Sequence, residues 1–173
     1  MLNVKEKSST GTLSELYHTD YYTWAMTNAE LLKKGKFNEV DYINLAEEVK
    51  DLGLSEYKEL RSYLANLLSR LYKWDNQPEL RTNSWKNTIA NSINEISLNL
   101  KDNPGLKYEP VFNEAFSDGW NKARYIISND MDINIKLISS EYPYSFNEII
   151  KKASGIAPDR IDESDISFLN NIF

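Results

Sequence analysis

The residues that most often carry out chemistry in proteins are scarce in this chain. It has no cysteine and one histidine, His18, in 173 residues. The lack of cysteine excludes disulfides, zinc–thiolate and iron–sulfur sites and thiol nucleophiles, because each of these needs the sulfur atom itself. A single histidine leaves one imidazole for acid–base chemistry and no second imidazole to share a metal ion. The residue types thus favour a non-enzymatic protein over an enzyme, leave acid–base chemistry by His18 open, and predict no cofactor.

Two groups of oxygen-bearing side chains have the spacing of metal ligands. Glu15 and His18 form the Glu-x-x-His pattern of helical two-metal sites, but such sites need two of these motifs and two further carboxylates. A second group repeats at helical spacing and would hold Mg²⁺ or Ca²⁺ only if another helix added ligands. Its members are Asp41, Asn44, Glu48 and Asp51. Such stripes usually form a solvated or ion-paired helix face, so we predict no metal site.

The segment 70–86 mixes cationic with aromatic side chains. Bases stack on aromatic rings and phosphates pair with cations, so this mixture is typical of single-stranded nucleic-acid binding. The competing interpretation is that Trp74 and Trp85 are core residues at a helix–helix corner, because both continue apolar helical stripes. The candidate binding residues are Arg70, Lys73, Trp74, Arg81 and Lys86.

Arg70 lies at the edge of an apolar helical face, near Leu67 and Trp74. A partly buried guanidinium needs a carboxylate partner. We predict that Glu48, on the preceding helix, forms a structural ion pair with Arg70, with Glu47 as the second choice.

Charge and hydropathy narrow the class of partner. The chain has 20 basic and 26 acidic side chains and a net charge of −6, so its overall field repels phosphate backbones and acidic membranes. Nucleic-acid binding therefore requires a local basic patch. No segment approaches the roughly 18 consecutive apolar residues of a membrane span, and the N-terminus has no apolar stretch of a secretory signal. We expect a cytoplasmic protein that does not bind membranes.

The spacing of apolar residues predicts an all-α protein, an up-and-down bundle of about five helices. A glycine in the second helix, Gly53, is predicted to end or kink it. In the fifth helix, Ala115, Gly119 and Ala123 would let another helix approach closely. The run 133–138 is too short and isolated to form a stable strand. The predicted helices cover residues 19–35, 41–53, 55–74, 85–101 and 110–126.

The two ends of the chain differ in character from the predicted bundle domain, residues 15–152. Residues 1–14 offer almost nothing to bury and are predicted to form a mobile N-terminal arm. Ser145 and Glu148 predict a capping box at the start of a short helix near the end of the bundle. Residues 153–173 form an irregular, acidic and apolar C-terminal tail, which is either a docking helix or a disordered segment.

Several short strings occur together in an order that resembles one known family. They are LYHTDYYTW at 16–24, NLAEEVKDLGLSE at 44–56, LYKW at 71–74 and SW at 84–85. From about Leu16 to Ile150 the chain resembles the bacterial domain-of-unknown-function family 29. The resemblance implies an all-helical fold and transfers no established activity. Such proteins often have a histidine before the Leu-Lys-Trp string, where this chain has Arg70.

These observations favour a non-enzymatic protein-interaction module that contacts an unidentified protein partner through its acidic surface and its C-terminal tail. The alternative is a protein that binds or processes single-stranded nucleic acid through segment 70–86, in a stress or toxin–antitoxin system. A salt-dependent affinity for single strands would distinguish the second from the first. A carboxylate-metal enzyme is the third interpretation, and it predicts that metal removal changes the melting behaviour.

Overall fold

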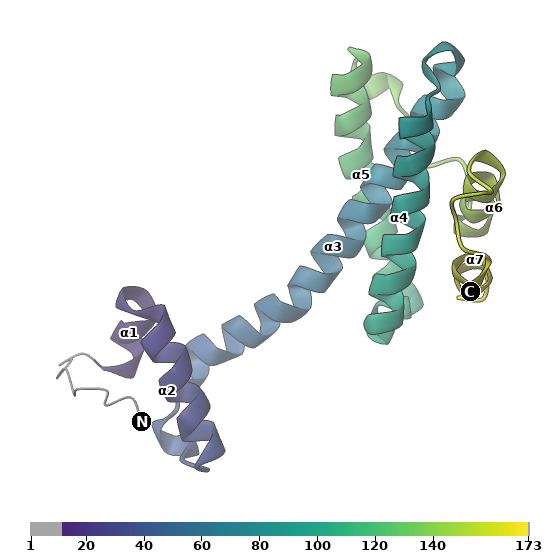
Figure 1. The fold of residues 1–173 in the computed structure, drawn as a ribbon. Coiled ribbons are helices and arrows are strands. Elements are labelled where there is room, and N and C mark those ends of the chain that lie inside the picture. Colours follow the sequence, from purple (N-terminus) through teal and green to yellow (C-terminus); the bar gives the residue numbers. More distant parts are fainter. Residues whose placement is uncertain (1–11, 173) are drawn as a thin grey trace. The chain divides into compact units, whose positions relative to one another are not determined.

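The computed structural model describes residues 12–172, and no strand occurs in this range (Figure 1). The predicted all-α class is therefore confirmed. No helix in the same range is long and apolar enough to cross a membrane. The α-helices are α1 (Leu13–Thr19), α2 (Tyr21–Lys33), α3 (Tyr42–Asn76), α4 (Asn83–Asp102), α5 (Glu109–Met131), α6 (Phe146–Ile156) and α7 (Glu163–Asn170).

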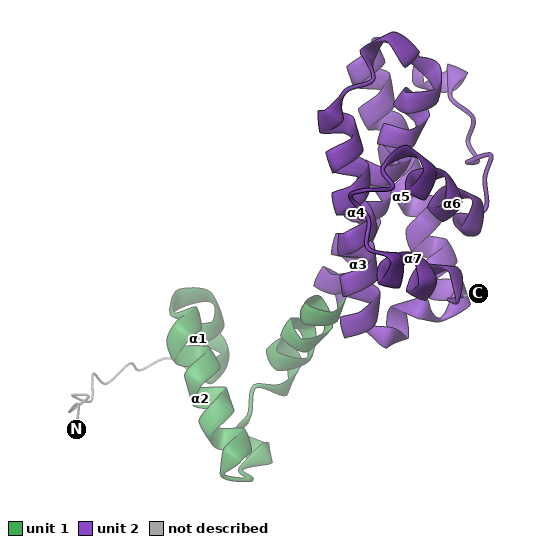
Figure 2. Ribbon diagram, turned by 45° about the vertical axis from the view of Figure 1, so that its right-hand side comes forward, with its two compact units in different colours: residues 1–53 green, residues 54–173 purple. Residues whose placement is uncertain are grey.

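The chain divides into two compact units, Met1–Gly53 (unit 1) and Leu54–Phe173 (unit 2), coloured separately in Figure 2. This division differs from the predicted bundle domain 15–152, because helix α3 begins in unit 1 and ends in unit 2. Residues 1–11 of the predicted arm lie outside the described residues. The rest of the predicted arm is part of α1, where Thr12 and Glu15 form a capping box.

Helix α3 replaces two of the predicted helices. It continues for 35 residues through Gly53, so the alternative in which the helix ends at this glycine was wrong. A glycine costs a helix only about 1 kcal/mol relative to alanine, and the long runs of helix-forming residues on both sides outweigh this cost. The predicted helix 19–35 corresponds to α2, whose N-cap is Asp20 rather than Thr19, because the Asp20 side chain accepts a hydrogen bond from the N–H of Thr23. Helix α1 precedes it and was not predicted.

Unit 2 is built on three helices that alternate in direction. Helices α3 and α4 are antiparallel, because Glu56 near the middle of α3 contacts Asn103 after the end of α4, whereas Arg70 further along α3 contacts Trp85 at the start of α4. Helices α3 and α5 are parallel. Tyr57 bonds to Asp118, and Lys73 bonds to Asp130 further along both helices. The up-and-down order predicted for about five helices is thus found among these three, and the predicted helices 41–53 and 55–74 are the single helix α3. Its core includes the fully buried Leu60, Leu64, Leu68, Ile89, Ile93, Ile96, Ala115, Ala123 and Ile127.

A glycine allows α5 to approach α3 closely. A Cβ atom at Gly119 would lie 2.9 Å from the Cβ of Leu64 and 3.2 Å from the backbone oxygen of Arg61. The distance to Leu64 is shorter than carbon–carbon contact permits, so only glycine fits without a shift of the neighbouring helix. The close approach predicted for the small-residue face of α5 is therefore present.

The C-terminal segment includes helix α7, which packs against α4 within unit 2. Leu169 of α7 is fully buried, and the buried carboxylate of Asp165 accepts hydrogen bonds from Ser97 and Lys101 of α4, both at 2.7 Å. The predicted capping box of Ser145 and Glu148 begins α6, which also packs against α4. Residues 163–170 of the tail therefore form a docking helix, which is one of the two alternatives stated for it.

Unit 1 is held together mainly by a polar and aromatic network. The indole N–H of Trp24 donates to Asp41 at 3.0 Å, and the buried Asn28 bridges the carbonyl oxygen of Trp24 and the N–H of Asp41. The ring of Tyr17 packs edge-on against Trp24. Of the apolar residues described in this unit, only Trp24 and Val40 are buried.

Candidate functional site

The structure brings the predicted basic and aromatic residues together where α3 ends and α4 begins, a region that we call the basic corner (Arg70, Lys73, Trp74, Arg81, Trp85 and Lys86). The guanidinium carbon of Arg70 lies 5.1 Å from the centroid of the Trp85 ring, and the ammonium nitrogen of Lys73 lies 5.9 Å from it. The guanidinium of Arg81 lies 5.0 Å from the centroid of Trp74. Cations of the protein itself therefore lie over both indole rings, where a nucleic-acid base would have to stack.

Burial further reduces the positive charge that the basic corner presents to a nucleic-acid phosphate. Lys73 is only 4% exposed and forms an ion pair with Asp130 of α5. Arg70 is partly buried, and this desolvation lowers the pKa of its guanidinium, although the negative charge of Asp130 acts in the opposite direction. The Nε atom of Arg70 is buried and has no hydrogen-bond partner. Lys86 lines a hollow beside Trp74 and Arg81.

The predicted ion pair between Glu48 and Arg70 is not formed, and this expectation is corrected. The two residues lie about six turns apart on the single helix α3. Glu48 instead accepts hydrogen bonds from the hydroxyl groups of Tyr17, at 2.7 Å, and Tyr21, at 2.8 Å. These bonds lower the pKa of the Glu48 carboxyl. The missed signal was the pair of tyrosines four residues apart, one in α1 and one in α2, whose hydroxyl groups both reach one carboxylate.

The other predicted ligand groups have structural roles in unit 1. The carboxylate of Asp41 accepts from Trp24 and, at 2.7 Å, from Asn44, so this part of the polar stripe faces protein. Glu15 caps α1 by accepting from the N–H of Thr12 at 2.7 Å. The ring of His18 packs edge-on against Tyr17. Among residues 12–172, no three acidic or histidine side chains come close enough to hold a metal ion.

A groove with apolar walls crosses unit 1, and we call it the apolar groove. It has a volume of about 440 Å³ and lies between the end of α2, the following turn and the first turns of α3. The sequence predicts the apolar stripe of α3, but the structure leaves it uncovered, with Tyr42 72% and Val49 61% exposed. The groove is lined by Leu32, Phe37, Val40, Tyr42, Leu45, Ala46 and Val49.

The uncovered apolar surface reaches the upper end of the range of about 300–600 Å² that the largest patch of a typical monomer exposes. Leu52 lies one turn beyond Val49 on α3 and is 71% exposed. Together with Leu32, Phe37 and Tyr42, these side chains expose about 600 Å², given that one large aromatic side chain alone has about 150–250 Å². Contiguous apolar patches of this size mark sites of protein contact. The groove can therefore bind an apolar surface, and the phenol of Tyr42 is the one polar side chain among its lining residues.

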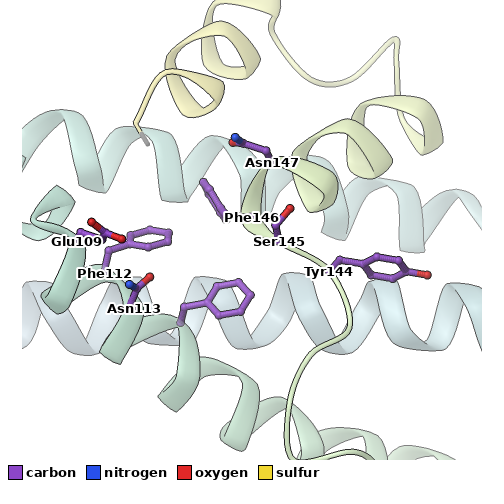
Figure 3. A pocket seen from close by; sticks show the side chains of 8 residues that line it. Glu109, Phe112, Asn113, Tyr144, Ser145, Phe146 and Asn147 are labelled. Carbon is purple, nitrogen blue, oxygen red and sulfur yellow. The ribbon is translucent and has the colours of Figure 1, made fainter.

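A second pocket lies between α5 and the start of α6, and Figure 3 shows the side chains that line it. It has a volume of about 320 Å³ and aromatic walls that include Phe112 and Phe146, whose ring centroids are 4.9 Å apart. The hydroxyl of Ser145 donates to the carboxylate of Glu148 at 2.7 Å and accepts from the backbone N–H of Glu148, so it forms the capping box of α6.

A family model of a domain of unknown function, DUF29, matches residues 16–153. No curated protein and no solved structure matches the chain.

Proposed function

The chain belongs to the DUF29 family, a domain family of unknown function, and we propose that it is a non-enzymatic, cytoplasmic protein-interaction module. The observation that carries this proposal is the apolar groove of unit 1 with its uncovered α3 stripe. Recognition of a partner needs shape and apolar area rather than catalytic groups, and apolar area is what this surface supplies.

The balance of buried and exposed side chains in unit 1 supports the proposal. Among residues 12–53 of this unit, two apolar residues are buried, Trp24 and Val40, whereas nine large ones are exposed. Full burial of a large apolar side chain contributes about 1.5–3 kcal/mol, so covering this surface would stabilise unit 1 strongly. The exposed residues are Tyr21, Tyr22, Met26, Leu32, Phe37, Tyr42, Ile43, Val49 and Leu52.

The shape and charge of unit 1 favour one kind of partner. The apolar groove is formed by helices and presents residues at spacings of three and four, which is the surface that accepts the apolar face of an amphipathic helix. The described residues of this unit, 12–53, contain eight acidic and four basic side chains, a net charge of −4. The partner that fits is therefore a protein segment that forms an amphipathic helix with basic residues beside its apolar face.

Site-specific photocross-linking tests this proposal. A benzophenone amino acid at Val49, introduced in the native host, should give an adduct with one protein. The same probe at Lys151, an exposed residue of unit 2 with no ion pair or hydrogen bond in the structure, is the positional control. Adding Leu52→Glu beside the Val49 probe should abolish the adduct, because a carboxylate would then enter the apolar contact.

The identity of the cross-linked segment decides the result. The proposal requires that the attached peptide is an amphipathic helix with basic flanks and that the adduct is lost with Leu52→Glu. An adduct with nucleic acid, an equal adduct from position 151, or an adduct that tolerates Leu52→Glu would contradict it.

The alternative role, binding of single-stranded nucleic acid at the basic corner, draws less support from the geometry. Arg70 and Arg81 lie over the indole rings of Trp85 and Trp74, and the charge of Lys73 is paired with Asp130. A single-stranded oligonucleotide whose affinity falls steeply with salt and is lost in Arg81→Gln would favour this role instead.

A further inference from the structure

The pocket between α5 and the start of α6 has the size of a small-ligand site, and we call it the aromatic pocket (Figure 3). Its volume is about 320 Å³, at the lower end of the range of about 300–1,000 Å³ that ligand sites occupy. It lies within unit 2 and shares no lining residue with the apolar groove of unit 1. A pocket of this size accommodates one small molecule.

Three phenylalanine rings form the floor of the aromatic pocket. Phe112 is 1% exposed and Phe146 9%, and their ring centroids lie 4.9 Å apart in an edge-to-face arrangement. The centroid of the Phe116 ring lies 6.5 Å from each of them. Rings that are packed against one another in this way do not move aside easily, so the pocket exists before a ligand enters. An aromatic ligand would add one more ring contact of the kind that is favourable at about 4.5–7 Å.

One side of the aromatic pocket carries an unpaired negative charge. Glu109, Phe112, Asn113 and Phe116 are spaced by three and four residues, so they share one face of α5. Figure 3 shows Glu109 and Asn113 on the same side of the pocket. Among the described residues that line the pocket, Glu109 is the only charged one. Neither its carboxylate nor the side-chain amide of Asn113 forms a hydrogen bond or ion pair within residues 12–172.

The other charges beside the aromatic pocket also favour a cationic ligand. Lys152 lies over the ring of Tyr144, with its ammonium nitrogen 4.6 Å from the ring centroid, and it is ion-paired with a carboxylate of α3. Its positive charge is therefore already balanced. A second carboxylate, that of Glu148, is hydrogen-bonded to the lining residue Ser145. An anionic ligand would meet the negative charges of both Glu109 and Glu148, so the pocket selects against it.

We propose that the aromatic pocket binds a small arylalkylamine, which is a flat aromatic ring joined by a short carbon chain to an ammonium group. The ring packs on the phenylalanine floor. The ammonium group donates to the carboxylate of Glu109 and to the amide oxygen of Asn113, because it carries three N–H donors and accepts nothing. Its positive charge is also attracted by nearby aromatic faces. Affinity should therefore depend on both the ring and the charge of the ligand.

The test is an NMR titration of the full chain with three probes that share one indole ring and differ in the end group of a two-carbon chain. Tryptamine ends in an ammonium group, tryptophol in a hydroxyl and indole-3-propionate in a carboxylate. Tryptamine should bind most tightly and indole-3-propionate most weakly, and the side-chain amide signals of Asn113 and Asn147, which line the pocket, should shift. Equal affinities for the three probes, or shifts confined to residues outside the pocket, would overturn the proposal.

The variant Glu109→Gln separates the effect of charge from that of shape, because it keeps the size of the side chain. It should weaken tryptamine about threefold, as expected for the loss of an exposed ion pair. It should leave tryptophol unchanged and strengthen indole-3-propionate. The matched control Glu114→Gln removes an exposed carboxylate of the same helix that does not line the pocket, and it should change none of the affinities. The same effect in both variants would contradict the proposal.

A second pair of variants tests the location of the site. Asn113→Trp places a bulky side chain in the pocket from an exposed position of α5 and should abolish binding of tryptamine. Ser117→Trp, at an exposed position of the same helix outside the pocket, should not. Tryptamine binding that survives Asn113→Trp would overturn the proposal. Because unit 1 contributes no residue to the aromatic pocket, this result is independent of the proposed protein interaction.

Discussion

The guanidinium carbon of Arg70 lies 5.1 Å from the centroid of the Trp85 ring. The sequence predicts a carboxylate as the partner of this guanidinium, whereas the structure gives it an aromatic ring. The contact joins the end of α3 to the start of α4. A cation over an indole ring is attracted by the negative face of the ring, and partial desolvation strengthens this attraction.

A double-mutant cycle should therefore detect coupling between Arg70 and Trp85. With Arg70→Met and Trp85→Leu, we expect a coupling free energy of about 0.5–1 kcal/mol in the free energy of unfolding measured by urea titration. The control cycle combines Arg81→Met with Trp85→Leu, because Arg81 lies over Trp74 instead. Equal coupling in both cycles would show that the contact with Arg70 is not specific.

The buried ammonium of Lys73 should depend on its partner Asp130. Lys73 is buried, while Asp130 is about half exposed. Asp130→Asn leaves a buried charge without a countercharge, so we expect the free energy of unfolding to fall by about 1–3 kcal/mol. Asp132→Asn, at the left-handed end of α5, is the control and should cost nothing, because asparagine tolerates this conformation. A stable Asp130→Asn variant would mean that water solvates Lys73.

The same substitution should have opposite effects at two glycines. Gly119→Ala places a Cβ atom 2.9 Å from that of Leu64, so we expect a loss of about 1–3 kcal/mol in the free energy of unfolding. Gly53→Ala places a Cβ atom in open space within α3, so we expect a gain of up to about 1 kcal/mol. Thermal and urea unfolding measure both. A harmless Gly119→Ala would show that α5 can move away from α3 at little cost.

The stability of unit 1 should depend on the ionisation of Glu48. Hydrogen bonds from Tyr17 and Tyr21 lower the pKa of this carboxyl, so its stabilising contribution is present above its ordinary pKa of about 4.5 and is lost as the pH falls through the lowered value. Carbon-detected NMR can follow the carboxyl directly. In the variant Tyr17→Phe/Tyr21→Phe, the midpoint for Glu48 should rise, and an unchanged midpoint would exclude these hydrogen bonds.

The hydrogen bond that Tyr17 donates also has an effect at alkaline pH. Together with partial burial, it raises the pKa of the Tyr17 phenol to about 12. The contribution of Tyr17 is therefore complete below pH 10 and is lost as the pH rises through about 12. Glu48→Gln should bring the absorbance titration of Tyr17 back toward that of a free phenol.

Docking of α7 should depend on Leu169. This side chain is fully buried, and Leu→Ala substitutions at such sites cost about 2–5 kcal/mol when the helix stays in place. If the loss exceeds the local stability of α7, the helix should detach instead, and hydrogen exchange at residues 163–170 should become fast. Ser167→Ala, on the same helix, should leave exchange unchanged, and protected amides in Leu169→Ala would contradict the docking role.

The sequence by itself determined the helical class, the small-residue approach of α5 and the capping box at Ser145, because these depend on residues close together in the chain. Periodicity and capping act within a few turns of a helix. The stripe containing Leu60 and Leu64 and the stripe containing Val49 follow the same pattern, so both are predicted to be apolar faces.

Only the tertiary structure decided which of these faces is covered. Leu60 and Leu64 are fully buried in unit 2, whereas Val49 is exposed in unit 1, because amphipathic spacing specifies a face and not the surface that meets it. The same reason explains the partners of Glu48 and Arg70. The charge of each side chain indicates that it needs a partner. That Glu48 bonds to Tyr17 and Tyr21, and that Arg70 lies over Trp85, depends on how distant segments of the chain pack.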